Sequence, residues 1–295
     1  MSQRKWIGTT YGSGWMHRWL ILSLRYIDVR LVYLFSAIFV IPVCLLVNNS
    51  RRTSYAYFRK IWGFGRWRSA WMTYLNHYYF AQAVIDKFAM YAGRRFDVEI
   101  ENFDEFTVRA NRDEGFLHFS AHVGNYEIAG YTLVSEKKRI HAVVFGFEKA
   151  SVVQNRTSMF DKTNISMISI KEDMSHLFEI DNALCNGDIV SFPTDRSAGA
   201  TKSIEVMFLG HKTTFPVGPF SVATMRGLDV LAVNVMKVGS KKYKIHIAPL
   251  YYDKQASRRE QMRQLAQAYA AELEKRLKEH PAQWFNFYDF WSLQE

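Results

Sequence analysis

The sequence predicts an α/β fold with a largely parallel central sheet flanked by helices, preceded by an N-terminal hydrophobic helical region that associates with a membrane. From about residue 96 onward, short apolar runs typical of buried strands alternate with helical segments. The first 92 residues instead space their apolar side chains by three and four positions, which is typical of helices. We therefore expect a basic, aromatic, membrane-associating region over 1–92 and an α/β domain over 93–295.

Helices in the first region are expected over 12–30 and 54–92, with a bend at Gly63 and Gly65. Strands are expected over 97–103, 116–120, 140–147, 165–170, 188–195, 203–210, 228–238 and 241–250. Helices of the α/β domain are expected over 149–163, 175–187, 213–227 and 257–280. The last of them carries one apolar stripe suited to core packing, and the aromatic segment that follows is expected to pack back on the domain.

The positive charge of the chain is confined to its N-terminal quarter. Residues 1–80 contain 11 Lys and Arg but a single acid, which gives 11 minus 1, or the whole net charge of +10. Six of the eight tryptophans lie there too. Cations and amphipathic rings together suit an anionic membrane surface. Arginine and aromatic rings would also suit single-stranded nucleic acid, but the apolar run described next favours the membrane, and we predict no nucleic-acid partner.

Residues 31–47 form a run of 17 residues without charge. This length is at the lower limit for crossing a bilayer as a helix, and Pro42 would kink it. A true span and a re-entrant or interfacial helix both stay open, and a buried core helix is a further alternative. Cys44 and Cys185 imply no disulfide framework. We therefore expect an inner (cytoplasmic) membrane location with the α/β domain facing the reducing cytoplasm.

One histidine stands where an open α/β sheet places its functional sites. His122 follows an apolar strand, and Gly124 permits a tight turn into a helix that Asn125 can cap. Glu127 would lie in the first turn of that helix, close enough to bond one imidazole nitrogen. The other nitrogen could then remove a proton from an alcohol or amine. His118 shares the strand face of His122, and we interpret it as a packing residue.

The pattern alone leaves less specific readings open. A histidine and a carboxylate five positions apart arise by chance in a chain with nine histidines, and a buried core histidine beside a surface acid fits equally well. A metal-dependent hydrolase is a third reading. The sequence has no H-E-x-x-H motif and no CxxC pair, so its ligands would have to be scattered. We predict neither a metal nor a cofactor.

Three blocks of the sequence resemble the lipid A late acyltransferases, the lauroyl and myristoyl transferases within the lysophospholipid and glycerolipid acyltransferase superfamily. In "SAHVGNYEIAG", the residues His122, Gly124, Asn125, Tyr126 and Glu127 match the signature in order. The resemblance covers most of the chain. Each block is weak by itself, and their combination is specific.

The second and third blocks lie further along the chain. "FPTDRSAGATKSIEVMFLGHKTTFPVGPFSVATMRG" supplies the family's Asp as Asp195, and its "FP-G" as Phe215, Pro216 and Gly218. "HPAQWFNFYDFW" resembles the family's "P-x-QW" ending through Gln283 and Trp284 among its first residues. Arg196 stands where the family commonly has glutamine, and the tail lacks a basic aromatic end, so the acceptor can differ from lipid A.

The resemblance implies an enzyme that moves a fatty acyl chain from an acyl thioester to a membrane lipid. The donor would be acyl carrier protein or acyl-CoA, and the acceptor a hydroxyl or amine of a lipid A-like or related glyco- or amino lipid. His122 and Glu127 would be catalytic in this reading. Substrate contacts would come from a second set of residues: Gly124, Asn125, Asp195, Arg196, Pro216 and Gly218. The alternative is a non-catalytic, membrane-bound lipid-binding scaffold of the same fold.

Overall fold

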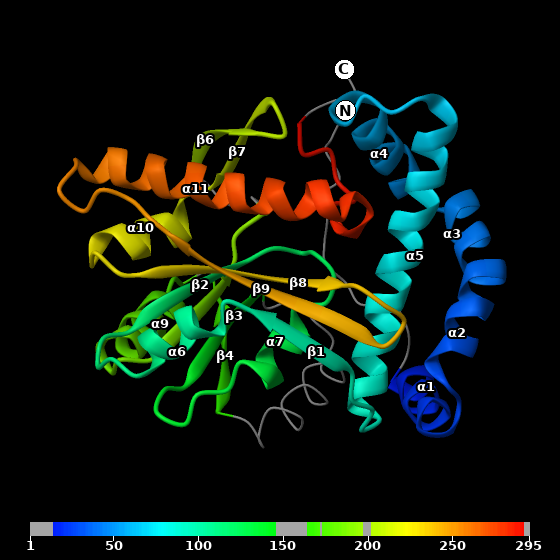
Figure 1. The fold of residues 1–295 in the computed structure, drawn as a ribbon, viewed down its shortest axis with the longest axis horizontal. Helices are drawn as coiled ribbons and strands as arrows, with labels where there is room; N and C mark the ends of the chain where they lie inside the picture. Colours follow the sequence, from blue (N-terminus) through cyan, green and yellow to red (C-terminus); the bar gives the residue numbers. More distant parts are fainter. Residues whose placement is uncertain (1–13, 146–163, 172, 197–201, 292–295) are drawn as a thin grey trace.

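The computed structural model describes residues 14–145, 164–171, 173–196 and 202–291 (Figure 1). A seven-stranded sheet runs in the order β1-β9-β8-β2-β5-β3-β4. Its strands are β1 (Asp97–Glu101), β2 (Phe116–Ser120), β3 (Ile140–Phe145), β4 (Ile165–Ile170), β5 (Ile189–Pro193), β8 (Val230–Lys237) and β9 (Lys242–Leu250). The pairing of β8 with β9 is antiparallel and all other pairs are parallel. This confirms the predicted largely parallel sheet.

Two layers of helices cover the faces of the sheet. Alternate side chains of β2 divide between them, because Leu117 and Phe119 join one apolar cluster and Phe116 joins the other. The first cluster is completed by α9 (His176–Cys185), α10 (Val217–Met225) and α11 (Arg258–Glu279). The second is completed by α6 (Phe103–Ala110) and α7 (Glu127–Thr132). The predicted helix over 149–163 lies outside the described residues.

A hairpin replaces the start of one predicted helix. The sequence predicts helix over 213–227, but β7 (His211–Pro216) pairs antiparallel with β6 (Ser203–Phe208), and α10 begins only at Val217. Leu209 and Gly210 turn the hairpin with φ of 52° and 80°, the left-handed geometry of a tight two-residue turn. The neighbouring β-branched Thr213 and Thr214 suit a strand better than a helix.

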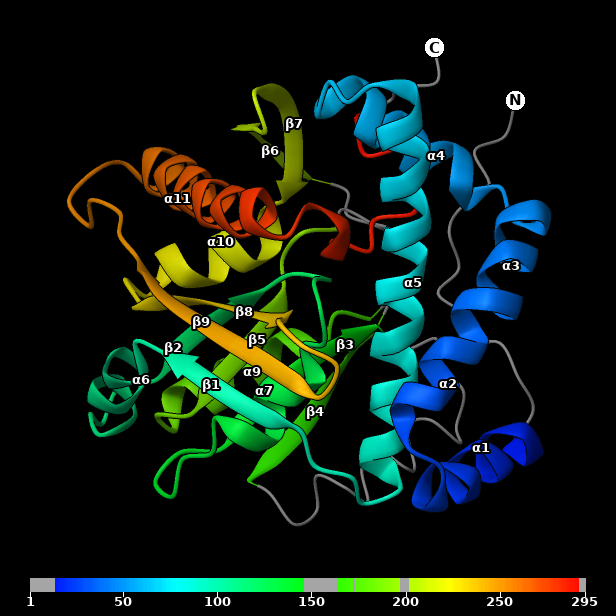
Figure 2. The same cartoon turned by 45° about the vertical axis from the view of Figure 1, so that its right-hand side comes forward.

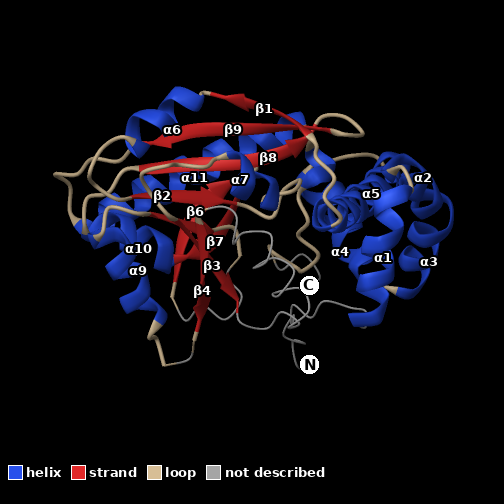
Figure 3. Cartoon of the chain, turned by 90° about the horizontal axis from the view of Figure 1, so that it is seen from below, coloured by secondary structure: helices blue, strands red, loops and turns tan. Residues whose placement is uncertain are grey.

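The N-terminal helices form a layer beside the sheet rather than over either face (Figures 1 and 3). Its elements are α1 (Gly14–Tyr26), α2 (Val29–Phe35), η1 (Ser36–Val40), α3 (Ile41–Val47), α4 (Ser50–Ala56), η2 (Tyr57–Ile61) and α5 (Arg66–Tyr91). The bend predicted at Gly63 and Gly65 is present, because residues 62–65 are not helical. The long helix α5 stands between the sheet and the segment from α2 to α3 (Figure 2).

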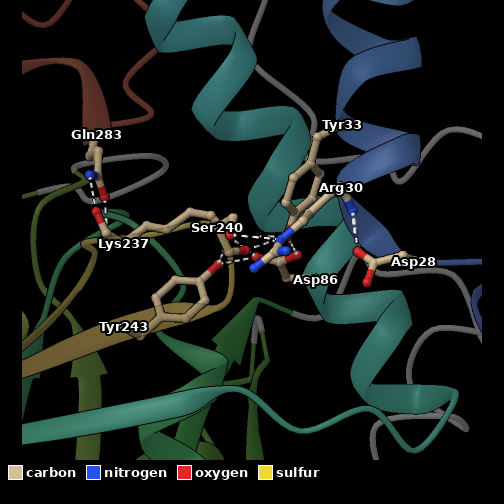
Figure 4. A network of polar contacts seen from close by, with 8 residues as sticks. All are labelled: Asp28, Arg30, Tyr33, Asp86, Lys237, Ser240, Tyr243 and Gln283. Atoms are coloured by element: carbon tan, nitrogen blue, oxygen red, sulfur yellow. Dashed lines mark hydrogen bonds and ion pairs between the residues drawn. The ribbon is translucent and has the colours of Figure 1, made fainter.

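A buried polar cluster, Tyr33, Asp86, Lys237 and Tyr243, fixes this layer to the sheet (Figure 4). Asp86 of α5 accepts hydrogen bonds from Tyr33 of α2 and Tyr243 of β9, and it forms an ion pair with Lys237 of β8. Lys237 Nζ also bonds both phenol oxygens, at 3.1 and 3.3 Å. We call this group the docking cluster. It holds the helical layer against the edge of the sheet where β8 ends.

Candidate functional site

The candidate site lies just beyond the carboxyl ends of two adjacent parallel strands. The register of β2 and β5 pairs Ser120 with Pro193, and Thr194 N–H continues the ladder to the Ser120 carbonyl at 2.8 Å. One further step brings His122 and Asp195 together. His122 Nδ1 lies 2.7 Å from Asp195 Oδ1, and the His122 backbone N–H donates to Asp195 Oδ2 at 3.1 Å. The parallel register of β2 and β5 therefore brings His122 and Asp195 together at the carboxyl ends of these strands.

The Asp195 carboxylate is an acceptor held in its ionised form. Its side chain is 1% exposed. Burial by itself raises the pKa of Asp195, but His122, Arg196 and the Trp284 indole outweigh burial and lower that pKa to about 2. An ionised carboxylate only accepts hydrogen bonds, so the imidazole proton resides on Nδ1 of His122 and donates to Asp195. The lone pair of the imidazole is then on Nε2.

His122 is set up as a neutral base with one open nitrogen. Burial, together with the nearby Arg196 charge, lowers the pKa of His122 against the opposing pull of Asp195. The ring is therefore neutral at pH 7. Among the described residues, no hydrogen bond involves Nε2, and the side chain is 19% exposed. The Tyr126 ring packs edge-on to the imidazole, with centroids 5.8 Å apart. Nε2 can take a proton from a hydroxyl or amine that reaches it.

Gly124 brings the chain against β8 immediately after His122. Its φ is +48°, and a Cβ atom there would lie 1.9 Å from the Val235 carbonyl oxygen. A side chain is thus excluded both by conformation and by contact. Gly124 shapes the turn, as predicted. Asn125 does not cap the following helix, because α7 has no side-chain cap hydrogen bond and Asn125 is buried.

Glu127 takes a different place from the one expected. It lies in the first turn of α7, as predicted, but the carboxylate on His122 Nδ1 belongs to Asp195. Glu127 forms an ion pair with Lys87 at 2.6 Å and accepts a hydrogen bond from Tyr91 at 3.1 Å, both on α5. The expected Glu127–imidazole bond is wrong because the turn at Gly124 leads the helix toward α5. Sequence proximity favoured the nearer acid over Asp195, which parallel pairing supplies from 73 residues away.

The remaining predicted substrate contacts divide between two places. Arg196 Nη2 donates to the Phe285 carbonyl at 2.7 Å, which ties the loop after β5 to the C-terminal segment beside His122. Pro216 precedes α10, whose first residue, Val217, donates its N–H to the Lys202 carbonyl at 3.2 Å. Gly218 has open space where a Cβ would be. An anion-binding role for this helix start stays a prediction.

Trp284 was not singled out as a site residue by its pattern. Its indole Nε1–H donates to Asp195 Oδ2 at 2.9 Å, and the side chain is buried. A buried tryptophan N–H usually has a hydrogen-bond partner. The Gln283–Trp284 pair in an aromatic tail could therefore have indicated a polar contact of this indole. Within the described ranges, no group of three His, Cys, Asp or Glu side chains lies close enough together to hold a metal ion.

Of three comparisons with known proteins, the one with sequence models of families supports the resemblance seen in the motifs. Among solved structures, the 1-acyl-sn-glycerophosphate acyltransferase PlsC from Thermotoga maritima aligns with 91% of this chain and 99% of its own, at 17% identity and a TM-score of 0.37. No curated protein sequence matches the chain. Residues 81–292, well over half of the chain, match the sequence model of the bacterial lipid A biosynthesis acyltransferases. The chain therefore belongs to the bacterial lipid A biosynthesis acyltransferase family.

Proposed function

We propose that this protein transfers a fatty acyl chain from an acyl thioester, carried by acyl carrier protein or coenzyme A, to a hydroxyl or amine of a membrane lipid. The acceptor is a lipid A-like molecule or a related glyco- or amino lipid. One observation carries the proposal: His122 has Nδ1 bound to the ionised Asp195 while Nε2 stays open at the edge of the sheet. That arrangement suits a general base.

The reaction follows from this geometry. Nε2 of His122 takes the proton of the acceptor hydroxyl or amine as the acceptor attacks the thioester carbonyl carbon. The carbon–sulfur bond then breaks, and the imidazolium returns its proton to the leaving thiolate. Asp195 stabilises the imidazolium in between, and it keeps the tautomer in which Nε2 has the lone pair. Asp195 thus takes the role that the spacing of the motif suggests for Glu127.

The donor side of the proposal rests on charge. Exposed cations gather on η2 and the start of α5: Arg59, Lys60, Arg66 and Arg68. Acyl carrier protein is acidic, so such a surface would speed its encounter with the enzyme. Raising ionic strength should then slow transfer from acyl carrier protein far more than transfer from acyl-CoA. Equal salt dependence for the two donors would contradict steering by these residues.

The membrane side of the proposal rests on the outer face of the helical layer. Within the described residues, one helix, Val29–Val47, is long and apolar enough to cross a bilayer, and 22% of it is buried. Apart from Arg30 at its start, its exposed side chains are mainly large and apolar: Leu31, Leu34, Phe35, Ile38, Phe39, Val40, Val43, Leu46 and Val47. Exposed tryptophans flank it, with Trp15 and Trp19 on α1 and Trp67 and Trp71 on α5. Such rings settle at the level of lipid head groups.

The packing of α5 favours a helix that lies along the membrane rather than through it. Tyr74 bonds the Ala37 carbonyl at 2.9 Å and Asp86 bonds Tyr33, so α5 accompanies the apolar helix over much of its length. On the side away from Tyr74, Asn76 donates to the Ala282 carbonyl of the sheet domain, and Asp86 pairs with Lys237 of β8 as well as with Tyr33. Crossing the bilayer would carry this polar side of α5 into hydrocarbon, at high cost. We place the apolar face in one leaflet of the inner membrane, with the sheet domain in the cytoplasm.

Depth measurements test this orientation. Single cysteines introduced as Leu31→Cys, Phe39→Cys and Val47→Cys in a Cys44→Ser, Cys185→Ser background would carry a fluorophore into anionic vesicles. Quenching by lipids labelled at known depths should place all three within about 10 Å of the head groups. A crossing helix would instead place Phe39 near the bilayer centre and the other two at opposite interfaces. A separate Cys44→Ser protein that keeps the natural Cys185, which is exposed on the sheet domain, provides the unquenched control.

The acyltransferase itself is tested by lipid mass spectrometry of the host with and without the gene, complemented by wild type or by His122→Ala. We expect one lipid class to lose an acyl chain in the deletion and to regain it only with wild type, because loss of the base slows transfer by about 10²- to 10⁴-fold. His211→Ala, which removes an exposed histidine from β7, is the matched control and should complement fully. Full complementation by His122→Ala, or an unchanged lipid profile in the deletion, would favour a non-catalytic scaffold.

A further inference from the structure

The segment after α11 makes an isolated antiparallel β-bridge with the chain that carries His122. Phe285 N–H donates to the His122 carbonyl at 2.9 Å, and Gly124 N–H donates to the Gln283 carbonyl at 3.0 Å. Val123 and Trp284 face each other in an antiparallel bridge between these bonds. The residues beyond β2 therefore have a backbone partner that comes from the far end of the sequence. Displacing this segment would displace the backbone of His122.

Buried amide side chains hold the segment on both sides. Gln283 accepts the Lys237 N–H at 2.8 Å and donates to the Lys237 carbonyl at 2.7 Å, which fixes it to the end of β8. Asn76 of α5 donates to the Ala282 and Trp284 carbonyls at 2.9 and 2.8 Å. These amide groups are shielded from solvent, because Asn76 and Gln283 are each 2% exposed. The position of Trp284 is thus set by the helical layer and the sheet together.

The Trp284 ring is held in an aromatic cluster, which fixes the direction of its N–H. Edge-on neighbours lie 5.2 to 5.8 Å away between centroids: Tyr57, Phe208, Phe290 and Trp291. The indole Nε1–H points at Asp195 Oδ2, 2.9 Å away, on the oxygen that also accepts the His122 backbone N–H. Asp195 Oδ1 is thereby left for the imidazole. The indole fixes which carboxylate oxygen faces His122.

We propose that Trp284 is a positioning residue that acts on His122 through Asp195, so that the C-terminal segment is a working part of the catalytic site. This inference rests on the proposed function, in which His122 is the base. An N–H donated to a carboxylate draws off part of its negative charge. Without that donor, Asp195 becomes a stronger acceptor and stabilises the imidazolium more, so His122 is protonated at higher pH.

The charged surroundings of His122 leave few competing causes for such a shift. The loop after β5 supplies Asp195 and Arg196, whose charges act on the imidazole in opposite directions. From α11, the Tyr269 hydroxyl donates to the Ser120 carbonyl at 2.9 Å and stays neutral. Residues 282–285 have no charged side chain. Within the described residues, the Trp284 indole N–H is the only polar hydrogen of this segment that bonds the Asp195 carboxylate, and the Phe285 N–H bonds the backbone carbonyl of His122.

Trp284→Phe and Trp291→Phe form a matched pair for the test. Both remove an indole from the same aromatic cluster. The Trp291 Nε1–H, however, has no hydrogen-bond partner among the described residues and does not reach Asp195. The readouts are the pH dependence of acyl transfer and the titration of the His122 imidazole followed by NMR. The second readout needs no activity.

We expect Trp284→Phe to move the acidic limb of the rate profile, and the His122 titration with it, upward by about half a pH unit or more. Trp291→Phe should leave both midpoints unchanged. A Trp284→Phe protein with the wild-type midpoint, whatever its rate, would overturn the inference. If wild type transfers no acyl chain, the proposed function fails, and the NMR titration still decides the role of Trp284.

A measurement on unmodified protein covers the case in which Trp284→Phe does not fold. The indole N–H resonance of Trp284 should shift with pH, with the same midpoint as the His122 imidazole, because both share the Asp195 carboxylate. An indole signal that is constant across the His122 titration would overturn the proposal.

Discussion

Two buried ionic groups lie at the same end of the sheet, and they differ in one respect. The docking cluster is closed: the side chains of Asp86 and Lys237 are 0% and 4% exposed, and each polar atom of the pair has protein partners. The site pair is open: Asp195 accepts three hydrogen bonds, whereas His122 Nε2 has no partner among the described residues. A filled network holds elements together, and a network with one vacant position can do chemistry.

Burial shifts the pKa values in both groups, but the net shift depends on how strongly the partners of each residue oppose it. Burial raises the pKa of Asp86 and lowers that of Lys237, so each relies on the other to stay charged. In the site, donors overcome burial and lower the pKa of Asp195 to about 2, whereas burial prevails at His122 and keeps it neutral. The site therefore joins a fixed anion to a neutral base, and the docking cluster joins two charges that cancel.

The largest expected effect separates the two carboxylates near His122. Asp195→Asn should slow transfer by about 10²- to 10⁴-fold, because an amide N–H toward Nδ1 forces the imidazole proton onto Nε2. Glu127→Gln should lower the free energy of unfolding through its Lys87 contact, with a loss of rate at least tenfold smaller. Steady-state rates and denaturant unfolding of both variants check this. A larger rate loss in Glu127→Gln would return the catalytic role to the acid of the motif.

The docking cluster should respond in stability. Asp86→Ala leaves the buried Lys237 ammonium unpaired and should cost about 3–5 kcal/mol of unfolding free energy. The double variant Asp86→Leu, Lys237→Met removes both charges and should cost much less. Denaturant unfolding in detergent measures both. Equal destabilisation by the single and double variants would show that the cluster does more than balance charge.

A smaller effect concerns His118, which lies on β2 four residues before the base. Burial among Phe106 and Phe116 lowers its pKa to about 3, well below the ordinary 6.5. Below pH 6.5, His118 binds a proton in the unfolded chain but not in the folded chain. Protonation therefore favours unfolding, and the free energy of unfolding is highest above pH 6.5 and decreases as the pH falls toward 3. The loss amounts to roughly 3 kcal/mol at pH 4.

His118→Phe keeps an aromatic ring and removes that proton. The free energy of unfolding of this variant should fall less steeply between pH 6.5 and 4 than that of wild type. His246, whose pKa burial lowers to about 4 with help from Arg276, keeps its own contribution and leaves a residual slope. Identical slopes in the variant and wild type would mean that His118 is protonated in the fold.

The sequence allowed most of the elements and the position of His122 to be predicted, because both depend on local pattern. The apolar run of β2, the glycine at the turn and the acid in the first turn of α7 can be read within a dozen residues. The partners of His122 cannot, because Asp195 arrives through the register of β2 with β5. Trp284 arrives through a segment that pairs with Val123 from 161 positions later in the chain. Register and tail docking are set by packing over the whole domain.

The start of α10 was misplaced for a related reason. The letters over 213–227 are apolar enough for a helix, and only pairing with β6 decides that the first four belong to a hairpin. Glu127 was assigned to His122 for the opposite reason, since nearness in sequence was taken for nearness in space. The general lesson is that spacing identifies which residues can react, and topology decides which of them meet.

The segment that forms the β-bridge with Val123 is also among the last parts of the chain to be synthesised. His122, Asp195 and Trp284 are far apart in the sequence, so the ribosome adds them at different times, with Trp284 last. A nascent chain that already contains His122 and Asp195 still lacks Phe285, which bonds the His122 carbonyl, and Trp284, which bonds the Asp195 carboxylate. The contacts that Trp284 and its neighbours make with His122 and Asp195 can therefore form only after residue 285 has left the ribosome.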